Sequence, residues 1–326
     1  MRNNVGLLVL ASLALWGCSS RVYVDKEEVA WQPASSMGDL GRSGATSTAV
    51  DGKGYVGCGN APDGSYLHDF WAYDAATNKW EQKTDYPGKG GHAVTSFAIN
   101  GKVYFCLGFA GSKQLCNDVW EYDPLSNRWS QKREFPGQGR YSAKSFVIGK
   151  YAYVGTGSYD SSSEYLGDFW RYDPEVDKWE QVAAIPVGRC GAVAFSVNGK
   201  GYCGLGIDEG GSFLNALKDF WEYDPATNQW SQLPDFPGLR YGAFGFGLGD
   251  AGYVGGGFDK RYFYNDMWRL NIDRRCWEKV ESPSGFAPRM GATPFIVNGK
   301  AYVGTGDNSL SILSDFFIFW SGINIR

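Results

Sequence analysis

The chain has little histidine and no excess of basic residues. Its 326 residues include only two histidines, His68 and His92, and the formal net charge is −4 with a pI near 5.4. Two histidines without a matched set of carboxylates or thiolates make a poor metal site. An acidic chain without a basic patch is poorly suited to nucleic acid. No nucleophile motif or phosphate-binding loop appears, so the sequence predicts no metal, no cofactor and no nucleic-acid partner.

The chain also lacks an apolar run long enough to span a bilayer. The apolar run at the N-terminus, Val5 to Trp16, is too short to do so. Arg2 precedes this run, and Leu15-Trp16-Gly17 leads into Cys18. The pattern resembles a bacterial lipoprotein signal, in which the cysteine becomes the lipidated first residue. An ordinary secretory signal with a chance cysteine is the alternative. We predict a signal peptide over 1–17, a tether over 18–28, and an exported protein held at the cell envelope, in the outer membrane or at the surface, by its lipid alone.

The other cysteines show no paired spacing. They are Cys58, Cys106, Cys116, Cys190, Cys203 and Cys276. Three of them replace small residues in glycine-rich segments, which favours buried free thiols. Cys106 and Cys116 are close enough in sequence for a local disulfide, so that alternative stays open.

What the chain does have is a repeat. Pairs of tryptophans lie nine residues apart at Trp71 and Trp80, Trp120 and Trp129, Trp170 and Trp179, Trp221 and Trp230, and Trp268 and Trp277. A tyrosine recurs upstream of each pair, at Tyr55, Tyr104, Tyr153, Tyr202, Tyr253 and Tyr302, at intervals of 49 or 51 residues. A period near fifty with four short β-type segments per unit indicates an all-β propeller.

Each unit contains four predicted strands, which we name a to d. An Asn-Gly or Asp-Gly turn joins strands a and b, as at Asn198-Gly199, and Asp-Pro turns join strands c and d. The last unit lacks strand d, whereas Val29 to Pro33 matches the strand-d pattern with no strand c before it. We therefore predict one domain over 29–326, a monomer of six four-stranded blades. Its N-terminal strand closes the last blade, with Trp31 near Phe317.

These repeats resemble the kelch motif from about Trp31 to the C-terminus. Glycines end strand b, a tyrosine or tryptophan lies on strand c, and a tryptophan lies on strand d. Kelch repeats usually have adjacent glycines after strand b, whereas here they are split, as in Gly57-Cys58-Gly59. The resemblance implies a six-bladed kelch β-propeller. The tryptophans themselves are expected to be packing residues between blades, because sites are seldom copied around a whole ring.

Five arginines recur thirteen residues before the strand-b tyrosine, and Gly91 stands in the sixth position. They are Arg42, Arg140, Arg189, Arg240 and Arg289. The resemblance to kelch domains that bind acidic peptides places such a ring around the funnel mouth. An aspartate, however, opens strand c in all six units, at Asp69, Asp118, Asp168, Asp219, Asp266 and Asp315. We favour a structural Arg–Asp pair in each blade over a ligand-binding ring.

Residues that break the repeat are better site candidates, because the fold does not require them. Most lie in the loops between strands b and c. The candidate ligand-binding residues are Lys260, Arg261, Tyr262, Phe263, Tyr264, Phe213, Tyr165, His68 and His92. Loops on a rigid scaffold commonly carry sites, although a loop packing its own aromatic side chains is equally consistent with the cluster at 258–265.

The sequence therefore predicts a non-catalytic propeller that binds a protein or glycan through the b–c loop face. The alternative is implied by a more distant resemblance, to exported kelch proteins of the sialic-acid epimerase or mutarotase type. On that alternative, an acidic sugar reacts in an arginine-lined funnel. The two hypotheses differ in whether the arginines face the funnel or lie buried in the blades.

Overall fold

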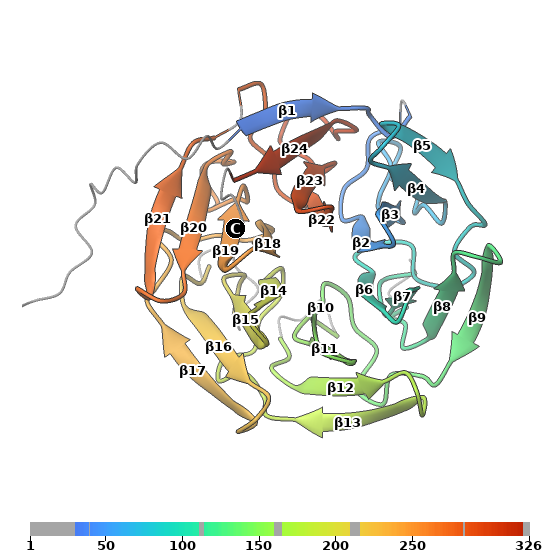
Figure 1. The fold of residues 1–326 in the computed structure, drawn as a ribbon, viewed down its shortest axis with the longest axis horizontal. Helices are drawn as coiled ribbons and strands as arrows, with labels where there is room; N and C mark the ends of the chain where they lie inside the picture. Colours follow the sequence, from blue (N-terminus) through green and yellow to red (C-terminus); the bar gives the residue numbers. More distant parts are fainter. Residues whose placement is uncertain are drawn as a thin grey trace, which may run out of the picture.

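The computed structural model describes residues 30–38, 40–110, 114–159, 165–208, 216–282 and 284–321. Within these ranges all regular structure is β: 24 strands form six four-stranded antiparallel sheets. The sheets are arranged as blades around a central axis (Figure 1). Six blades with no helices confirm the predicted fold class. The predicted signal peptide, Cys18, the tether and Phe213 lie outside the described residues.

Each blade consists of strands a to d in order from the axis outward. Blade 1 is β2 (Thr46–Val50), β3 (Lys53–Gly57), β4 (Phe70–Asp74) and β5 (Lys79–Gln82); blade 2 is β6 (Thr95–Ile99), β7 (Lys102–Cys106), β8 (Val119–Asp123) and β9 (Arg128–Lys132); blade 3 is β10 (Lys144–Ile148), β11 (Tyr151–Gly155), β12 (Phe169–Asp173) and β13 (Lys178–Val182). Blade 4 is β14 (Val193–Val197), β15 (Lys200–Gly204), β16 (Phe220–Asp224) and β17 (Gln229–Leu233); blade 5 is β18 (Phe244–Leu248), β19 (Ala251–Gly255), β20 (Met267–Asn271) and β21 (Cys276–Val280); blade 6 is β22 (Thr293–Val297), β23 (Lys300–Gly304), β24 (Phe316–Trp320) and β1 (Ala30–Ala34).

The a–b turns form as the sequence predicts. Asn198 and Gly199 have φ of 50° and 74°, and the equivalent residues of blades 1, 2 and 6 have the same signs. Two consecutive residues with positive φ define the type I′ turn, whose twist matches that of the strands it joins. The Asn-Gly and Asp-Gly dipeptides therefore set the register of strands a and b, which puts the small residues of strand a next to the axis.

The tryptophans of strand d pack between blades. Trp80 lies 4.9 Å from the ring of Phe316 in blade 6, and Trp129 lies 5.0 Å from Phe70 in blade 1. The indole nitrogen of Trp80 also donates to the main chain of the preceding blade, to Ser35 O at 2.8 Å. Each strand-d tryptophan thus fixes its blade to the one before it, as predicted from the repeat.

Strand β1 completes blade 6, confirming the predicted closure (Figure 1). Trp31 pairs with Phe319 in register and the two rings lie 4.9 Å apart, while Pro33 is opposite Phe317. The nearest ring is therefore Phe319, two residues beyond the predicted neighbour. Trp31 Nε1 donates to Glu281 O of blade 5 at 3.2 Å, the same bond that the other strand-d tryptophans make.

The six cysteines that follow Cys18 are all buried and free. The expectation of buried thiols is confirmed, and the possible Cys106–Cys116 disulfide is wrong. Strand pairing places Cys106 opposite Val119, in the core of the blade, rather than opposite Cys116. Within the described part of the chain no helix is long and apolar enough to cross a membrane.

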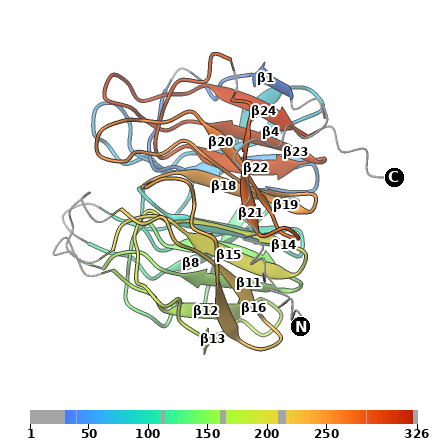
Figure 2. The ribbon, with the colours of Figure 1, turned by 90° about the vertical axis from the view of Figure 1, so that its left-hand side faces the viewer.

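The antiparallel order gives the ring two distinct faces. Strands a and c begin at the same face, so the b–c loops and the d–a connections lie together there, and the a–b and c–d turns lie on the opposite face (Figure 2). We call these the loop face and the turn face.

Candidate functional site

The recurring arginines pair with the recurring aspartates, as predicted. Arg189 donates from Nη1 to Asp219 Oδ1 at 2.9 Å and from Nη2 to Asp219 Oδ2 at 2.7 Å. The same two-bond pair joins Arg42 to Asp69, Arg140 to Asp168 and Arg289 to Asp315. In each of these four blades Nη1 also donates to a backbone carbonyl sixteen residues along the chain. Each pair ties the start of strand a to the start of strand c.

These pairs are parts of the scaffold. The five arginines are between 0% and 4% exposed, and none of them lines the central cavity. Burial opposes ionisation of Asp219, but its hydrogen bonds and the charge of Arg189 outweigh that effect and lower the pKa of the carboxyl. The favoured structural pair is therefore confirmed, and the alternative of an arginine-lined funnel is wrong, because the guanidinium groups lie buried inside the blades.

Blade 5 departs from this pattern. Arg240 makes a single bond to its aspartate, from Nη2 to Asp266 Oδ2 at 2.7 Å, and its guanidinium carbon lies 3.4 Å from the ring centroid of Tyr264. Arg240 Nε and Asp266 Oδ1 are buried without a hydrogen-bond partner. A cation–π contact thus replaces half of the usual pair, and it holds the b–c loop of blade 5 in place.

Blade 2 lacks the recurring arginine. Gly91 occupies the position, and a Cβ there would lie 2.7 Å from Tyr66 Cβ and 3.1 Å from His68 Nε2. Asp118 is consequently 7% exposed, accepts from Trp120 Nε1 at 2.8 Å, and keeps one carboxylate oxygen without a partner. The b–c loop of blade 1 takes the space that a side chain at position 91 would need.

A cavity of about 510 Å³ follows the axis of the ring and is lined by the six a strands. Small residues such as Ala143 and Ala192 make much of its wall. At the loop-face end the second residue after each arginine position has positive φ, including the non-glycines Ala93 (51°) and Ser142 (54°). Backbone bonds join neighbouring blades here: Ser142 N donates to Ala93 O at 3.0 Å and Gly242 N to Gly191 O at 3.0 Å.

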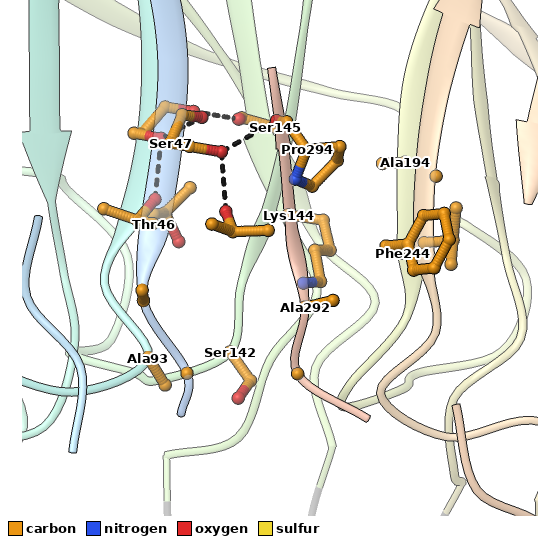
Figure 3. Close-up of a pocket in the computed structure, with 18 of the residues that line it drawn as sticks. Thr46, Ser47, Ala93, Ser142, Lys144, Ser145, Ala194, Phe244, Ala292 and Pro294 are labelled. Carbon is orange, nitrogen blue, oxygen red and sulfur yellow. Dashed lines mark hydrogen bonds between the residues drawn. The ribbon is translucent and has the colours of Figure 1, made fainter. Parts of the chain in front are cut away.

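One side of the cavity is a wall of hydroxyl groups from blades 6, 1, 2 and 3. Thr46 Oγ1 donates to Ser96 Oγ at 2.6 Å, and Ser96 Oγ donates to Ser47 O at 2.8 Å. Ser145 Oγ donates to Ser96 O at 2.6 Å. We call Thr46, Ser47, Ser96, Ser145 and Thr293 the hydroxyl wall. Ala194 and Phe244 make the facing side apolar (Figure 3).

A carboxyl group and an imidazole both line the loop-face end of the cavity. Ser43 Oγ donates to Asp307, joining blade 1 to blade 6, and burial raises the pKa of the Asp307 carboxyl. His92 lines the same cavity, and its ring stacks on Tyr66 with centroids 5.8 Å apart. Burial lowers the pKa of His92, and its Nδ1 has no hydrogen-bond partner. The cavity mouth therefore holds a carboxyl that resists losing its proton and an imidazole that resists gaining one.

The two histidines do not combine into one site. His92 stacks on Tyr66, whereas His68 stacks on Tyr86 at 6.3 Å. In the described ranges no group of three or more histidine, cysteine, aspartate or glutamate side chains could hold a metal ion.

The predicted cluster at 258–264 divides into a packed half and an exposed half. Phe263 packs against Phe258 with ring centroids 4.6 Å apart, and the Tyr264 hydroxyl donates to Asp259 Oδ2 at 2.6 Å. Asp259 also accepts from the backbone of Arg261 and Tyr262, which closes the loop. Lys260, Arg261 and Tyr262 are left exposed on the loop face. The expected packing of the loop's own aromatic side chains is confirmed for Phe263 and Tyr264, and the ligand-binding role of the exposed residues stays a prediction.

Large apolar side chains are exposed mainly on the loop face. Of the seven such residues in the described chain, five lie over blades 5, 6 and 1: Leu239, Tyr262, Leu310, Leu40 and Tyr66. Tyr262 is 65% exposed and Leu310 is 91% exposed. The other two, Leu125 and Val176, lie in c–d turns on the turn face. We call the five residues the apolar arc.

Comparison with known proteins agrees with the repeat. The family model described as KLHDC2/KLHL20/DRC7 Kelch-repeats domain matches residues 18–157, and the Kelch motif model matches residues 188–237. The chain is a six-bladed kelch β-propeller. A solved structure titled "Structure of YjhT" has a TM-score of 0.71 at 18% identity to this propeller, over 86% of this chain and 95% of that one. At that identity the likeness shows the fold alone.

Curated relatives match a short part of the propeller. Kelch-like protein 21 of Rattus norvegicus is 33% identical over 92 residues, and that of Homo sapiens is 32% identical over the same length. The matched segment covers 27% of this chain and 14% of either relative.

The split glycines of this kelch propeller have a structural explanation. The residue between them adopts the left-handed conformation that a first glycine would supply: φ is 59° at Cys58, 62° at Thr156 and 61° at Leu205. Blade 5 keeps adjacent glycines, Gly256 and Gly257, both with positive φ. The backbone is thus that of a kelch repeat. In five blades the left-handed conformation is adopted by a residue other than glycine, for which this conformation is strained.

Sequence reasoning found His92 but missed two charged residues that line the cavity of the propeller, Lys144 and Asp307. Lys144 lies nine residues before Tyr153, where the other blades have Thr46, Thr95, Val193, Phe244 and Thr293. Asp307 lies five residues after Tyr302, where the other blades have no charge. Aligning strands a and b across the six units would have revealed both. Tyr165, a predicted site residue, lies in the b–c loop of blade 3, where burial raises its pKa to about 12.

Proposed function

We propose that this kelch propeller binds a protein partner through its loop face, at the apolar arc and the adjoining Lys260 and Arg261, without catalysing a reaction. The observation that carries the proposal is that, among the described residues, five of the seven exposed large apolar side chains lie on the loop face over blades 5, 6 and 1. Monomeric proteins rarely expose clustered apolar surface without a use for it.

The composition of this surface suits a partner with an acidic and apolar segment. Tyr262 is the kind of side chain that commonly dominates binding energy at interfaces. Among the described residues no carboxylate forms an ion pair with Lys260 or Arg261, so both can attract one from a partner. The fold does not require a charged side chain at either position, because neither residue belongs to the repeated pattern.

Site-specific photo-cross-linking tests this proposal. A photoreactive phenylalanine at position 262 should capture a protein in the cells that produce the chain, and the same residue at position 125, on the turn face, should not. The captured protein is then purified and titrated against the propeller. Tyr262→Ala combined with Leu310→Ala should weaken binding at least tenfold, and Leu125→Ala should leave it unchanged. Capture from both positions contradicts the proposal, and so does an affinity that is unchanged in the Tyr262→Ala, Leu310→Ala variant. Capture of a glycan instead of a protein would show that the partner is a glycan.

A second candidate, a sugar epimerase or mutarotase, is favoured by the groups at the cavity mouth. Burial raises the pKa of Asp307 towards neutral pH, which suits a group that exchanges protons, and burial lowers the pKa of His92, which keeps its imidazole neutral and able to accept a proton. Magnetisation exchange between the anomers of N-acetylneuraminate measures this activity directly. The enzyme hypothesis is supported if the protein exchanges the anomers faster than the uncatalysed rate and if Asp307→Asn abolishes this acceleration. Exchange at the uncatalysed rate with the parent protein rejects the hypothesis.

We further propose that Cys18 carries a lipid and anchors the exported propeller to the cell envelope. The pattern Leu15-Trp16-Gly17-Cys18 supports this. The tether over 18–28 would leave the loop face free of the membrane.

A further inference from the structure

Lys144 is a basic side chain in the wall of the cavity without an acidic partner. It occupies the first position of β10 and points between the hydroxyl wall and the side formed by Phe244 and Ala194 (Figure 3). No described carboxylate forms an ion pair with it. The titratable groups whose charges act on Lys144 are two buried thiols, Cys190 and Cys203.

An ammonium group in this position is partly shielded from water by the cavity wall, and among the described residues it has no counter-charge. Burial lowers the pKa of Lys144, and burial also raises the pKa of Cys190 and Cys203 to about 11, so neither thiol is an anion near neutral pH. Removing a charge from water is costly unless an opposite charge compensates it. A ligand that brings one negative charge into the cavity would supply the missing partner.

The hydroxyl wall offers acceptors rather than donors. The hydroxyl groups of Ser96 and Ser145 already donate to backbone carbonyls, and the hydroxyl group of Thr46 donates to Ser96. Ser47 donates either to Pro294 O at 2.7 Å or to Thr293 Oγ1 at 2.6 Å. Each hydroxyl oxygen retains lone pairs. This side of the cavity therefore suits a ligand that carries its own O–H donors.

We infer that the central cavity binds a small hydroxylated carboxylate, with its anionic group on the Lys144 amine and its hydroxyl groups donating to the hydroxyl wall. The volume of about 510 Å³ falls within the range of small-molecule sites. None of the five residues of the apolar arc lines this cavity, and the inference concerns equilibrium binding, so it requires neither partner capture nor catalysis.

Calorimetric titration with three matched probes tests the inference. D-gluconate has both the charge and the hydroxyl groups, D-glucitol has the hydroxyl groups alone, and hexanoate has the charge alone. Gluconate should bind, and glucitol and hexanoate should bind at least tenfold more weakly. Lys144→Met should lower gluconate affinity at least tenfold. Lys178→Met removes an exposed lysine from the same blade and should change nothing.

Several results would overturn the inference. They are no heat with 10 mM gluconate, equal binding of glucitol, or equal binding by the Lys144→Met protein. Inorganic phosphate is the fourth probe, and binding as tight as gluconate would show a plain oxyanion site without hydroxyl recognition.

If Lys144→Met does not fold, wild-type protein with ¹³C-methylated lysines gives a second measurement. Gluconate should raise the pKa of the Lys144 dimethylamine and glucitol should not, because only a carboxylate stabilises the charged form. An unmoved Lys144 resonance contradicts the inference. Catalysis of anomer exchange is measured in a separate experiment. If no catalysis is found, the inference about gluconate binding is unaffected.

Discussion

At the scale of single residues, the same amino acid at equivalent positions of the repeat lies in different environments. Asp219 lies between the guanidinium of Arg189 and the indole of Trp221, whereas Asp118 has the indole of Trp120 and no guanidinium. The sequence predicts the pairs, since arginine and aspartate recur in phase. It also shows that blade 2 lacks the arginine, but not that Tyr66 and His68 fill the space.

Asparagine substitutions should separate these two aspartates. Asp219→Asn leaves Arg189 buried with a neutral partner and should destabilise the fold by roughly 3 kcal/mol, as breaking a buried pair does. Asp118→Asn removes a buried charge that has no cation and should change stability by less than about 1 kcal/mol or increase it. Urea denaturation of both variants and the parent measures the difference, and equal losses would contradict the assigned environments.

The paired aspartates also predict how stability depends on pH. The pKa values of Asp69, Asp168 and Asp219 are lowered: burial opposes ionisation but the arginine bonds and charges prevail. A carboxyl whose pKa is lower when folded stabilises the fold above its unfolded pKa of about 3.9. That contribution is lost as pH falls through the folded pKa. Urea midpoints should therefore fall steeply below about pH 4, and a flat profile from pH 5 to pH 3 would refute the pairing in solution.

At the scale of elements, strand β1 is the part on which ring closure depends. The sequence predicts it from an unmatched strand-d pattern at one end and a missing strand d at the other. The register, with Trp31 opposite Phe319, differs by two residues from the prediction because aligning one tryptophan does not fix which strand-c residue faces it.

Removing residues 1–36 should lower the melting temperature by several degrees or prevent folding. The deletion exposes the edge of β24, and it removes the contacts of Trp31 with Phe319 and Phe286. Loss of a buried aromatic side chain alone costs about 3–5 kcal/mol. A control deletion of residues 1–28 should melt like the parent. If the longer deletion also melts like the parent, the N-terminal strand does not close the ring.

Across the whole molecule, the repeat predicts the ring but not what its surfaces bind. Fold class, blade number and closure follow from periodic residues such as Trp80 and Tyr153. The apolar arc depends on which loop side chains are left exposed after packing, and the single-sequence pattern at 258–264 could not separate Tyr262 from Tyr264. The cavity depends on strand-a residues such as Lys144, which a search restricted to loops passes over.

The proposed anchor predicts a change in where the whole molecule is found. Cys18→Ser removes the thiol that would carry the lipid, so the exported propeller should move from the membrane fraction to the soluble fraction. Ser19→Ala, next to it, should leave the distribution unchanged. Membrane association that survives Cys18→Ser would reject lipidation at this residue.

The central claim is that the arginine ring is scaffold and the loop face over blades 5, 6 and 1 is the binding surface. Its most direct test is one comparison of urea midpoint and partner affinity for Arg189→Ala and for the double variant Lys260→Ala with Arg261→Ala. Arg189→Ala should cost roughly 3 kcal/mol of stability because Asp219 keeps a partly buried charge. The double variant should cost under about 1 kcal/mol and weaken binding of the cross-linked partner. An unchanged midpoint for Arg189→Ala together with lost binding would contradict the account and place the binding site at the arginines.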